Sequence, residues 1–450
     1  MDFIFKRKIY NKMLDWKQSS NGETALLIQG ARRVGKSTIA EQFAKNEYDS
    51  YIFIDFTKCS RDIKALFDDI SDLDYIFNRL QLAFGKTLVQ RKSVIVFDEV
   101  QDCPKARQAI KHLVADRRYD YIETGSLISI RQNIKNILIP SEEQEIKMFP
   151  LDYEEFRWAM GDVATIPLLR QVYQKKQPLG DGINRKLMRD FRLYMLVGGM
   201  PQAVSKYLST KSLSETDKTK RTIISLYDKD FMRIDPSGRA SEMFKAIPAQ
   251  LNKNSSRYQV SSATEHGRAD RLAETLFNMT ESMVVNMSYR ANDPGPGMAF
   301  HRDTAAFKMF LGDTGLFVTL AFWDKDFTEN IIYQKLLTDK LSKDLGYVYE
   351  NVVAQILKSS GIELYYYTFP TESRKHNYEI DFLLPDGDKV NPIEVKSSNY
   401  KTHASLDAFF NKFHSRIREQ YVVYTKDLRK DNMITYLPVY MTALLGNNKE

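Results

Sequence analysis

The feature that most constrains the fold is the segment Gly30-Ala31-Arg32-Arg33-Val34-Gly35-Lys36-Ser37, which matches the pattern G-x-x-x-x-G-K-[ST]. An apolar run from Ala25 to Ile28 precedes it, and Thr38 to Ala44 has the spacing of a helix. The pattern needs a strand, a tight turn and a helix in that order, because the N–H groups of the turn and of the helix N-terminus must converge on phosphates. The context therefore predicts a phosphate-binding loop in an α/β domain.

Residue types within this loop have distinct predicted roles. Gly30 and Gly35 permit the tight backbone turn. Lys36 would reach the β- and γ-phosphates of a nucleotide, and Ser37 would offer its hydroxyl to Mg²⁺. The residues that we predict to bind nucleotide here are Gly30, Arg32, Arg33, Val34, Gly35, Lys36, Ser37 and Thr38.

A second motif completes a predicted ATPase site. Ser93 to Phe97 is a short β-branched and aromatic run that ends in Asp98 and Glu99, as expected of a buried parallel strand that carries acids to the carboxyl edge of a sheet. Asp98 would bind nucleotide through the shell of the Mg²⁺ ion. Glu99 would orient or deprotonate the attacking water as a catalytic residue.

Two further runs predict strands of the same domain. Tyr119 to Glu123 leads into Thr124-Gly125-Ser126, where a hydroxyl could sense the γ-phosphate or the water, and we name Ser126 as the cofactor-binding candidate. A simple turn is the alternative at this position. Tyr51 to Phe56 supplies another strand. Strands that alternate with helical stretches predict a P-loop NTPase with a parallel sheet in a doubly wound α/β domain.

A third constellation lies near the C-terminus. Tyr378 to Leu384 alternates as a strand, a turn follows, and Val390 to Lys396 alternates again. Antiparallel pairing would bring Asp381, Glu394 and Lys396 together, in the D…(D/E)-x-K arrangement of restriction-like nucleases. In such sites two carboxylates hold Mg²⁺ or Mn²⁺ and the lysine helps to activate water. A surface hairpin with an ordinary ion pair is the alternative.

These motifs and several others carry a resemblance to a known family. The segments are GARRVGKST, VIVFDEVQ (94–101), ETGS (123–126), PLDYEEF (150–156), GGMP (198–201), LGDTGL (311–316), EIDFLL (379–384) and PIEVKSS (392–398). Over nearly the whole chain they resemble a family of bacterial and archaeal AAA-type ATP-binding proteins. The resemblance implies an ATPase followed by a winged-helix segment and a restriction-endonuclease-like (PD-(D/E)XK) module. Many relatives carry a Gly-Arg pair where this chain has Ile139-Pro140-Ser141-Glu142-Glu143, so no arginine finger is assigned.

One more acid joins the predicted C-terminal site. Leu345, Tyr349, Val352 and Ile356 form a helical apolar stripe, and Glu350 falls at its border. A helix packed on the hairpin through that stripe would hold Glu350 near Asp381 and Glu394. The family resemblance gives Glu350 the extra acidic position, and we predict these three acids as metal ligands.

The chain is expected to divide into four parts. Residues 1–160 form the AAA-type ATPase domain and 161–235 a helical lid or linker. Residues 236–330 read as a winged-helix-like domain, with short helices followed by strands around a loop at 292–297, and 331–450 form the restriction-endonuclease-like domain. Winged helices bind duplexes but also serve as domain interfaces, so both roles stay open for this segment.

Composition limits the class of protein and its partners. The net charge is +7, from 65 basic and 58 acidic residues, which favours anionic partners only modestly. No apolar run approaches the roughly 18 residues that cross a bilayer, and the N-terminal segment mixes charge too evenly for a signal peptide. Two cysteines and six histidines give no disulfide framework and no zinc spacing. We expect a cytoplasmic protein that does not bind a membrane.

Two functions from different classes remain open. In the first, ATP binding licenses a metal-dependent nuclease with Glu99 as the ATPase base and Asp381, Glu394 and Lys396 as nuclease residues. In the second, the protein is an ATP-dependent switch or binding module whose nuclease-like domain is inactive. The expected ligands are ATP and Mg²⁺, with Mg²⁺ or Mn²⁺ at the C-terminal site. The expected macromolecular partner is nucleic acid, DNA ahead of RNA, and assembly into a homo-oligomer stays open.

Overall fold

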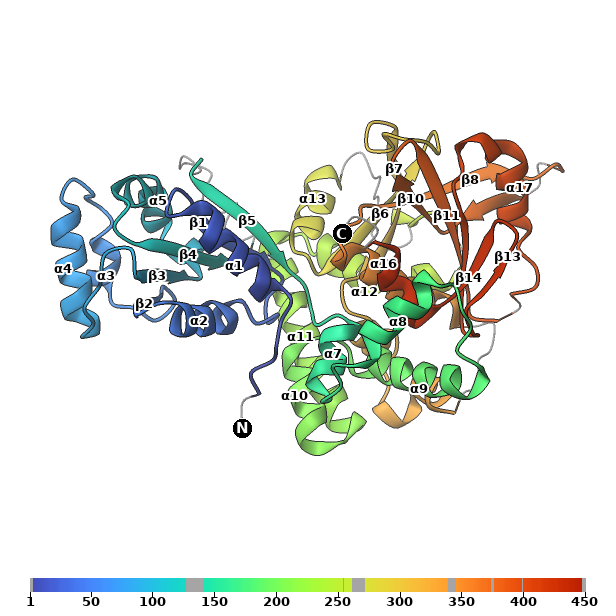
Figure 1. Cartoon of the computed structure of the whole chain (residues 1–450), viewed down its shortest axis with the longest axis horizontal. Helices are drawn as coiled ribbons and strands as arrows, with labels where there is room; N and C mark the ends of the chain where they lie inside the picture. Colours follow the sequence, from blue (N-terminus) through green and yellow to red (C-terminus); the bar gives the residue numbers. More distant parts are fainter. Residues whose placement is uncertain are drawn as a thin grey trace. The chain divides into compact units, whose positions relative to one another are not determined.

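A computed structural model describes residues 3–126, 141–253, 255–260, 272–338, 345–373, 376–398 and 400–446. The chain forms two compact units, Met1–Phe149 and Pro150–Glu450 (Figure 1). The first unit contains one sheet and the second contains two, and each unit has its own hydrophobic core.

The first unit contains a five-stranded parallel sheet with the order β2-β3-β4-β1-β5. Its strands are β1 (Ala25–Gly30), β2 (Ser50–Asp55), β3 (Ser93–Asp98), β4 (Asp120–Gly125) and β5 (Glu143–Met148). The first four lie where the apolar runs predicted strands. Every residue of β1, β3 and β4 is buried, as expected of central parallel strands that are covered on both faces. The predicted parallel α/β architecture of the N-terminal domain is therefore confirmed.

Helices cover this sheet. They are α1 (Ile9–Ser20), α2 (Lys36–Glu47), α3 (Arg61–Ala65), α4 (Leu73–Phe84), α5 (Pro104–Asp116) and the short 3-10 helix η1 (Val100–Asp102). One hydrophobic core joins alternate strand residues such as Leu27, Ile54 and Phe97 to residues of α4 and α5 such as Phe77 and Ile110. Helix α2 follows β1 directly and packs against β2, β3 and β4, which places the start of α2 at the carboxyl edge of the sheet.

The second unit begins with a run of helices. They are α7 (Tyr153–Ala159), α8 (Thr165–Gln174), α9 (Asp181–Val197), α10 (Pro201–Thr210), α11 (Leu213–Ile234), α12 (Arg239–Asn252), α13 (Ala273–Glu281), α14 (Thr314–Leu320) and α15 (Ile331–Leu337), with the 3-10 helix η4 (Phe327–Glu329). The chain breaks between α8 and α9 near Pro178 and Gly180, and between α9 and α10 at Gly198 and Gly199. Asp313 joins the GGMP and LGDTGL segments, because its carboxylate accepts hydrogen bonds from the Gly199 N–H at 2.5 Å and the Leu316 N–H at 2.8 Å.

Two sheets form the rest of this unit. A four-stranded sheet has the order β7-β6-β8-β9, from β6 (Val285–Ala291), β7 (Arg302–Leu311), β8 (Leu364–Pro370) and β9 (Asn377–Ile380). A five-stranded sheet has the order β10-β11-β12-β14-β13, from β10 (Phe382–Asp386), β11 (Lys389–Lys396), β12 (Gln420–Tyr424), β13 (Arg429–Asp431) and β14 (Ile434–Pro438). The remaining helices are α16 (Gly346–Ser359), α17 (Ala404–Phe413), η6 (His414–Arg416) and η7 (Val439–Leu445).

The four-stranded sheet spans a predicted domain boundary. Strands β6 and β8 pair in parallel, although β6 lies in the predicted winged-helix segment and β8 in the predicted endonuclease-like domain. The loop at 292–297 does connect two antiparallel strands, β6 and β7, as predicted. Part of the winged-helix segment, 261–271, lies outside the described residues. The four-part division remains a proposal, and this sheet unites the strands of two of its parts.

One predicted strand is in fact two. The segment from Tyr378 to Leu384 was expected to run as one strand, but β9 ends at Ile380 and β10 begins at Phe382 in the other sheet. Ile380 and Phe382 are both buried, so the alternation survives while the chain changes its pairing partner. Asp381 is the residue at this crossing. The predicted antiparallel hairpin with Val390 to Lys396 is present as β10 and β11.

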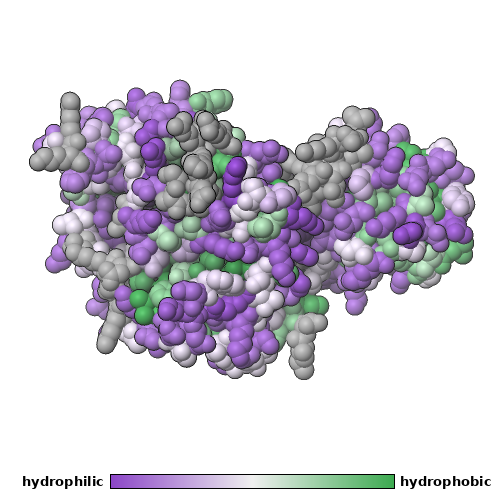
Figure 2. All heavy atoms as spheres, turned by 180° about the vertical axis from the view of Figure 1, so that it is seen from behind, coloured by the Kyte–Doolittle hydropathy of each residue, from purple (hydrophilic) through white to green (hydrophobic). Residues whose placement is uncertain are grey.

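One face of the molecule is mainly polar. Hydrophilic residues dominate the face drawn in Figure 2, and hydrophobic residues form small separate patches there. Across the described ranges, no helix combines the length and the apolar character needed to span a bilayer.

Candidate functional site

The phosphate-binding loop lies at the carboxyl end of β1, as its motif predicted. Arg33 and Gly35 both have positive φ, at 69° and 99°, so the backbone makes the tight turn that a phosphate-binding loop requires. The other predicted residues follow the same path, since Gly30 ends β1, Arg32 and Val34 lie in the turn, and Ser37 and Thr38 lie in the first turn of α2. The structure therefore holds the whole predicted set in one strand–turn–helix element.

Lys36 is buried and is held by uncharged oxygens. Its ammonium donates to the backbone carbonyls of Gly30 and Ala31, both at 3.1 Å. Burial lowers the pKa of Lys36, and the negative charges of Glu99 and Asp98 oppose that shift. A cation that binds backbone carbonyls within its own loop is available for exchange with phosphate oxygens, because no salt bridge must break first.

Asp98 ends β3 and meets two hydroxyl groups. Thr124 Oγ1, at the end of β4, donates to Asp98 Oδ1 at 2.5 Å, and the Ser37 hydroxyl also hydrogen-bonds to this carboxylate. Burial raises the pKa of Asp98, and these two hydrogen bonds partly offset the rise. Ser37 and Asp98, which were predicted to hold Mg²⁺, are thus brought together. Their hydroxyl and carboxylate oxygens suit this hard cation.

Glu99 has an unusual backbone conformation. Its φ of 52° and ψ of 51° place it in the left-handed region, which residues with a side chain adopt uncommonly and which clusters at functional sites. Two contacts hold it there. Its N–H donates to Thr124 Oγ1 at 3.3 Å, and its carboxylate accepts from Gln101 Nε2 at 2.5 Å. Thr124 therefore orients both acids of the motif, and it lies two residues before the predicted Ser126, which follows β4 directly.

A residue from the N-terminal segment also supports the loop. The Arg7 guanidinium donates to the carbonyl oxygens of Val34, at 2.9 Å, and of Phe149, at 2.6 Å. It joins the phosphate-binding loop to the segment after β5. Sequence reasoning missed Arg7 because a single arginine in a basic segment, far from the motif, carries no distinguishing pattern.

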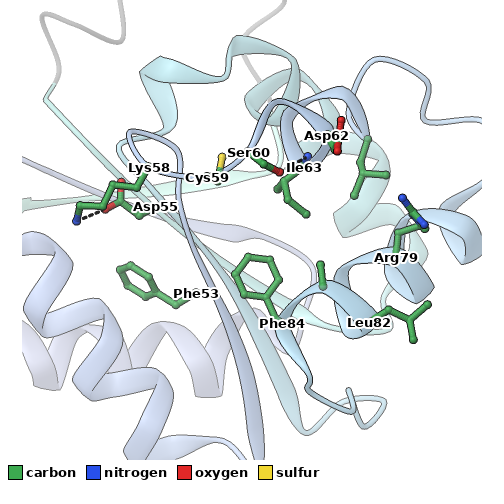
Figure 3. Close-up of a pocket in the computed structure, with 12 residues that line it drawn as sticks. Phe53, Asp55, Lys58, Cys59, Ser60, Asp62, Ile63, Arg79, Leu82 and Phe84 are labelled. Carbon is green, nitrogen blue, oxygen red and sulfur yellow. Dashed lines mark hydrogen bonds and ion pairs between the residues drawn. The ribbon is translucent and has the colours of Figure 1, made fainter.

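A cavity of about 600 Å³ lies at the end of β2, between that strand and helices α3 and α4 (Figure 3). The ion pair of Asp55 with Lys58 borders one side and Arg79 borders the other. Asp55 pairs in register with Asp98, so the cavity begins one strand away from the predicted Mg²⁺ ligand. Its lining, as described, includes none of the residues predicted to bind nucleotide, so it is separate from the phosphate-binding loop.

The C-terminal residues were also predicted to meet, and several of them do. Lys396 Nζ lies 2.6 Å from Glu394 Oε1, and Asp381 Oδ2 accepts a hydrogen bond from the Val395 N–H at 2.7 Å. Glu394 is buried, and burial raises its pKa while the charge of Lys396 opposes this. The hairpin therefore brings Asp381, Glu394 and Lys396 to one place, which leaves their predicted catalytic roles open to test.

Glu350 lies on α16 and meets a lysine that sequence reasoning missed. Lys308 Nζ, on β7, lies 3.7 Å from Glu350 Oε2 and forms a close ion pair with Glu379. Burial raises the pKa of Glu350 to about 7, against the charge of Lys308. Burial alone would lower the pKa of Lys308, but the charges of Glu350, Glu379 and Asp381 outweigh it and raise the pKa.

These acids do not form a group suited to a metal ion. In the part of the chain that the structure describes, no three or more His, Cys, Asp or Glu side chains are arranged to hold one. The charge of Asp381 raises the pKa of both Glu350 and Glu394. Each predicted ligand has a separate partner, since Glu350 lies near Lys308, Asp381 accepts from a backbone N–H and Glu394 pairs with Lys396. The predicted C-terminal metal site therefore lacks support in this geometry.

Comparisons with known proteins bear on the first unit. Residues 22–157 match the model of a family described as an AAA domain. Residues 188–326 and 345–441 match two domains of unknown function, DUF8612 and DUF4143 respectively. No curated protein matches the chain. The AAA match agrees with the parallel sheet and the phosphate-binding loop of the first unit, and supports an AAA-type domain there.

Solved structures give only distant likenesses. PCH-2 of C. elegans is 12% identical with a TM-score of 0.23, and the match covers 62% of this chain and 70% of that one. The Hef helicase domain of Pyrococcus furiosus is 11% identical with a TM-score of 0.19, over 99% of this chain and 94% of that one. VC1899 from Vibrio cholerae is 10% identical with a TM-score of 0.18, over 94% and 96%. Scores this low carry no argument about function.

Proposed function

We propose that this protein is a Mg²⁺-dependent ATPase that works as a nucleotide-driven switch. The observation that carries the proposal is the meeting of three strand ends at one sheet edge. The end of β1 supplies Lys36 and Ser37, the end of β3 supplies Asp98 and Glu99, and the end of β4 supplies Thr124. These side chains offer candidate groups for binding phosphate and Mg²⁺ and a candidate base, which are the parts that phosphoryl transfer to water requires.

Each residue has a role in this proposal. The loop N–H groups and Lys36 bind the phosphates, with Lys36 exchanging its two carbonyl partners for phosphate oxygens. Ser37 and Asp98 would hold Mg²⁺, which when bound neutralises charge on the β- and γ-phosphates. Glu99 orients the attacking water and accepts its proton. Thr124 fixes the positions of Asp98 and Glu99 through its single hydroxyl.

The binding step is tested by thermal unfolding with and without Mg²⁺-ATP. A ligand that binds only the native state adds about 2.7 kcal/mol of stability at a hundredfold excess over Kd. Wild type should gain this stabilisation and Lys36→Ala should not. Lys45→Ala, an exposed lysine on the same helix, is the matched control and should behave as wild type. Equal stabilisation of Lys36→Ala and wild type would remove the loop from the nucleotide site.

A metal-dependent nuclease in the C-terminal part is the second candidate. It is favoured by one observation, the placement of Asp381, Glu394 and Lys396 at one end of the β10–β11 hairpin. In that case the protein would nick DNA in Mn²⁺ or Mg²⁺, and Glu394→Ala or Lys396→Ala would abolish cleavage without changing ATP hydrolysis. Absence of cleavage of single- and double-stranded DNA and RNA, with ATP present, would leave the switch as the function. We also propose that the protein binds nucleic acid, that copies of it assemble into a homo-oligomer and that it is located in the cytoplasm.

A further inference from the structure

Lys308 occupies the middle of an acidic cluster that we define as Glu350, Glu379 and Asp381. These acids come from α16, β9 and the crossing between β9 and β10, while Lys308 comes from β7. The Lys308 ammonium forms an ion pair with Glu379 and lies 3.7 Å from Glu350. The charge of Asp381 also raises the pKa of Lys308. Only 6% of Lys308 is exposed, so this lysine belongs to the interior.

The surrounding fold fixes Lys308 in this place. Lys308 lies in β7 opposite Ser288 of β6, inside a strand pair that spans the whole length of β6. Three residues further on, the Asn351 amide of α16 binds both the N–H and the carbonyl of Leu311, at 2.8 and 3.2 Å. The Lys308 ammonium also lies 5.5 Å from the centre of the Tyr366 ring, within the range of a cation–π contact. Strand β7 and helix α16 are thus locked together, with Lys308 and Glu350 on facing elements.

Lys308 lies where the carboxylates of Glu350 and Glu379 would have to turn toward a metal ion. Mg²⁺ requires its oxygen ligands at about 2.0–2.1 Å in near-octahedral geometry, so carboxylates must turn toward one centre. Here the carboxylates of Glu350 and Glu379 lie against Lys308. Lys308 is no part of the predicted D…(D/E)-x-K arrangement, and it already brings a positive charge to these acids.

We propose that Lys308 is the built-in cation of the acidic cluster and that it excludes a divalent metal, so the C-terminal unit acts without metal-dependent cleavage. This rests on the proposed switch function and assigns the C-terminal unit a binding or structural part in it. The residues implied by the nuclease hypothesis are present, but Glu350, one of the predicted metal ligands, lies against a further cation, Lys308 of β7. The metal therefore does not fit the residues that were predicted to hold it.

The test counts Mn²⁺ bound to the full-length protein without nucleotide, by electron paramagnetic resonance of free Mn²⁺. Wild type should bind no Mn²⁺ at the cluster. Lys308→Met should bind one Mn²⁺ per chain, and the double variant Lys308→Met/Asp381→Asn should lose it. The expected change is therefore from no Mn²⁺ at the cluster in wild type to one Mn²⁺ per chain in Lys308→Met. Lys245→Met is the matched control, because this lysine pairs with Asp228 at 2.7 Å far from the cluster in sequence, and should leave binding unchanged.

Two results would overturn the proposal. One is a wild-type protein that binds one Mn²⁺ which Asp381→Asn abolishes; this arm needs no variant of Lys308. The other is a folded Lys308→Met protein that still binds none. If Lys308→Met does not fold, Lys308→Gln, which keeps a polar side chain without the charge, takes its place under the same criteria. Because nucleotide is absent throughout, the result is independent of whether Lys36 binds ATP.

Discussion

The two units each bury a lysine among acids, and the two lysines have opposite surroundings. In the first unit Lys36 donates to two backbone carbonyls, while Asp98 is met by hydroxyls of Thr124 and Ser37. In the second unit Lys308 is paired with Glu379 and Glu350. The pKa of Lys36 is lowered by burial, whereas the pKa of Lys308 is raised because its acids outweigh burial.

Similar residue types therefore support different chemistry in the two units. A lysine that donates to the backbone carbonyls of its own loop can exchange these hydrogen bonds for contacts with an incoming anion. The free-energy cost of the exchange is small, because no ion pair is broken. A lysine enclosed by carboxylates is already neutralised, and removing it leaves buried charge without compensation. The first arrangement suits a ligand site and the second suits a fixed part of the structure.

The strongest test of the comparison exchanges one acid in each unit. Glu99→Gln should keep ATP affinity while ATP turnover falls by about 10²- to 10⁴-fold, the usual contribution of a general base. Glu394→Gln should leave turnover at the wild-type value. Steady-state phosphate release and nucleotide titration measure the two quantities. Undiminished turnover in Glu99→Gln would assign the water-orienting role to another residue.

Replacing each lysine by methionine compares the two surroundings directly. Lys308→Met should lower the free energy of unfolding by about 3–5 kcal/mol, because it leaves buried carboxylates unpaired. Lys36→Met, measured without nucleotide, should stay within about 1 kcal/mol of wild type, because the lost partners are uncharged carbonyls. Urea unfolding, followed separately for each transition, gives both values. Equal losses in the two variants would contradict the distinction between them.

Thr124 should matter for turnover more than for stability. Its hydroxyl bonds Asp98 and receives the Glu99 N–H, and a hydrogen bond to a charged group contributes about 1.5–3 kcal/mol. We expect Thr124→Val to lower ATP turnover by about 10- to 150-fold, which is the same range expressed as a rate. Thr124→Ser keeps the hydroxyl and should retain most of the activity. A wild-type rate in Thr124→Val would show that the two acids need no such support.

The sequence predicted the ATPase edge well for a physical reason. The strand before the loop, the loop and its helix are contiguous, and the acids follow a run whose burial is complete, so local patterns contain the information. The helix that carries Glu350 was predicted from its apolar stripe, although α16 is buried more widely than that stripe. The strand break at Asp381 was missed because the alternation continues across it and only the pairing partner changes.

The contacts that sequence reasoning missed are all long-range. Lys308 is 42 residues from Glu350 and 71 from Glu379 along the chain, and within the run AAFKMFL it reads as one polar residue of an ordinary strand. Likewise the sequence gives no sign that Arg107, an arginine on helix α5, differs from a solvent-exposed one. It is nevertheless buried and donates hydrogen bonds to Glu123 and Glu143 at 2.9 and 3.2 Å. Charge partners of this kind are set by the packing of elements and leave no periodic signal.

The pH dependence of unfolding tests whether one buried cation, Arg107, keeps two neighbouring carboxylates ionised. Glu123 and Glu143 share Arg107, and burial raises the pKa of Glu123 to about 8 although Arg107 opposes the shift. The ordinary pKa of a glutamate is about 4.3, so between roughly pH 4.5 and 8 the folded protein holds a proton that the unfolded chain has released. The free energy of unfolding must therefore fall as the pH rises through this window, by at most about 1.4 kcal/mol per pH unit for one proton.

Glu123→Gln cannot ionise, so its unfolding free energy should lose this slope between pH 6 and 7, while Glu145→Gln, on the exposed side of β5, should keep it. Identical slopes in wild type and Glu123→Gln would mean that Arg107 keeps both acids ionised. A single buried cation would then hold two carboxylates in their charged form, which Lys308 does not achieve for Glu350, whose pKa is raised to about 7.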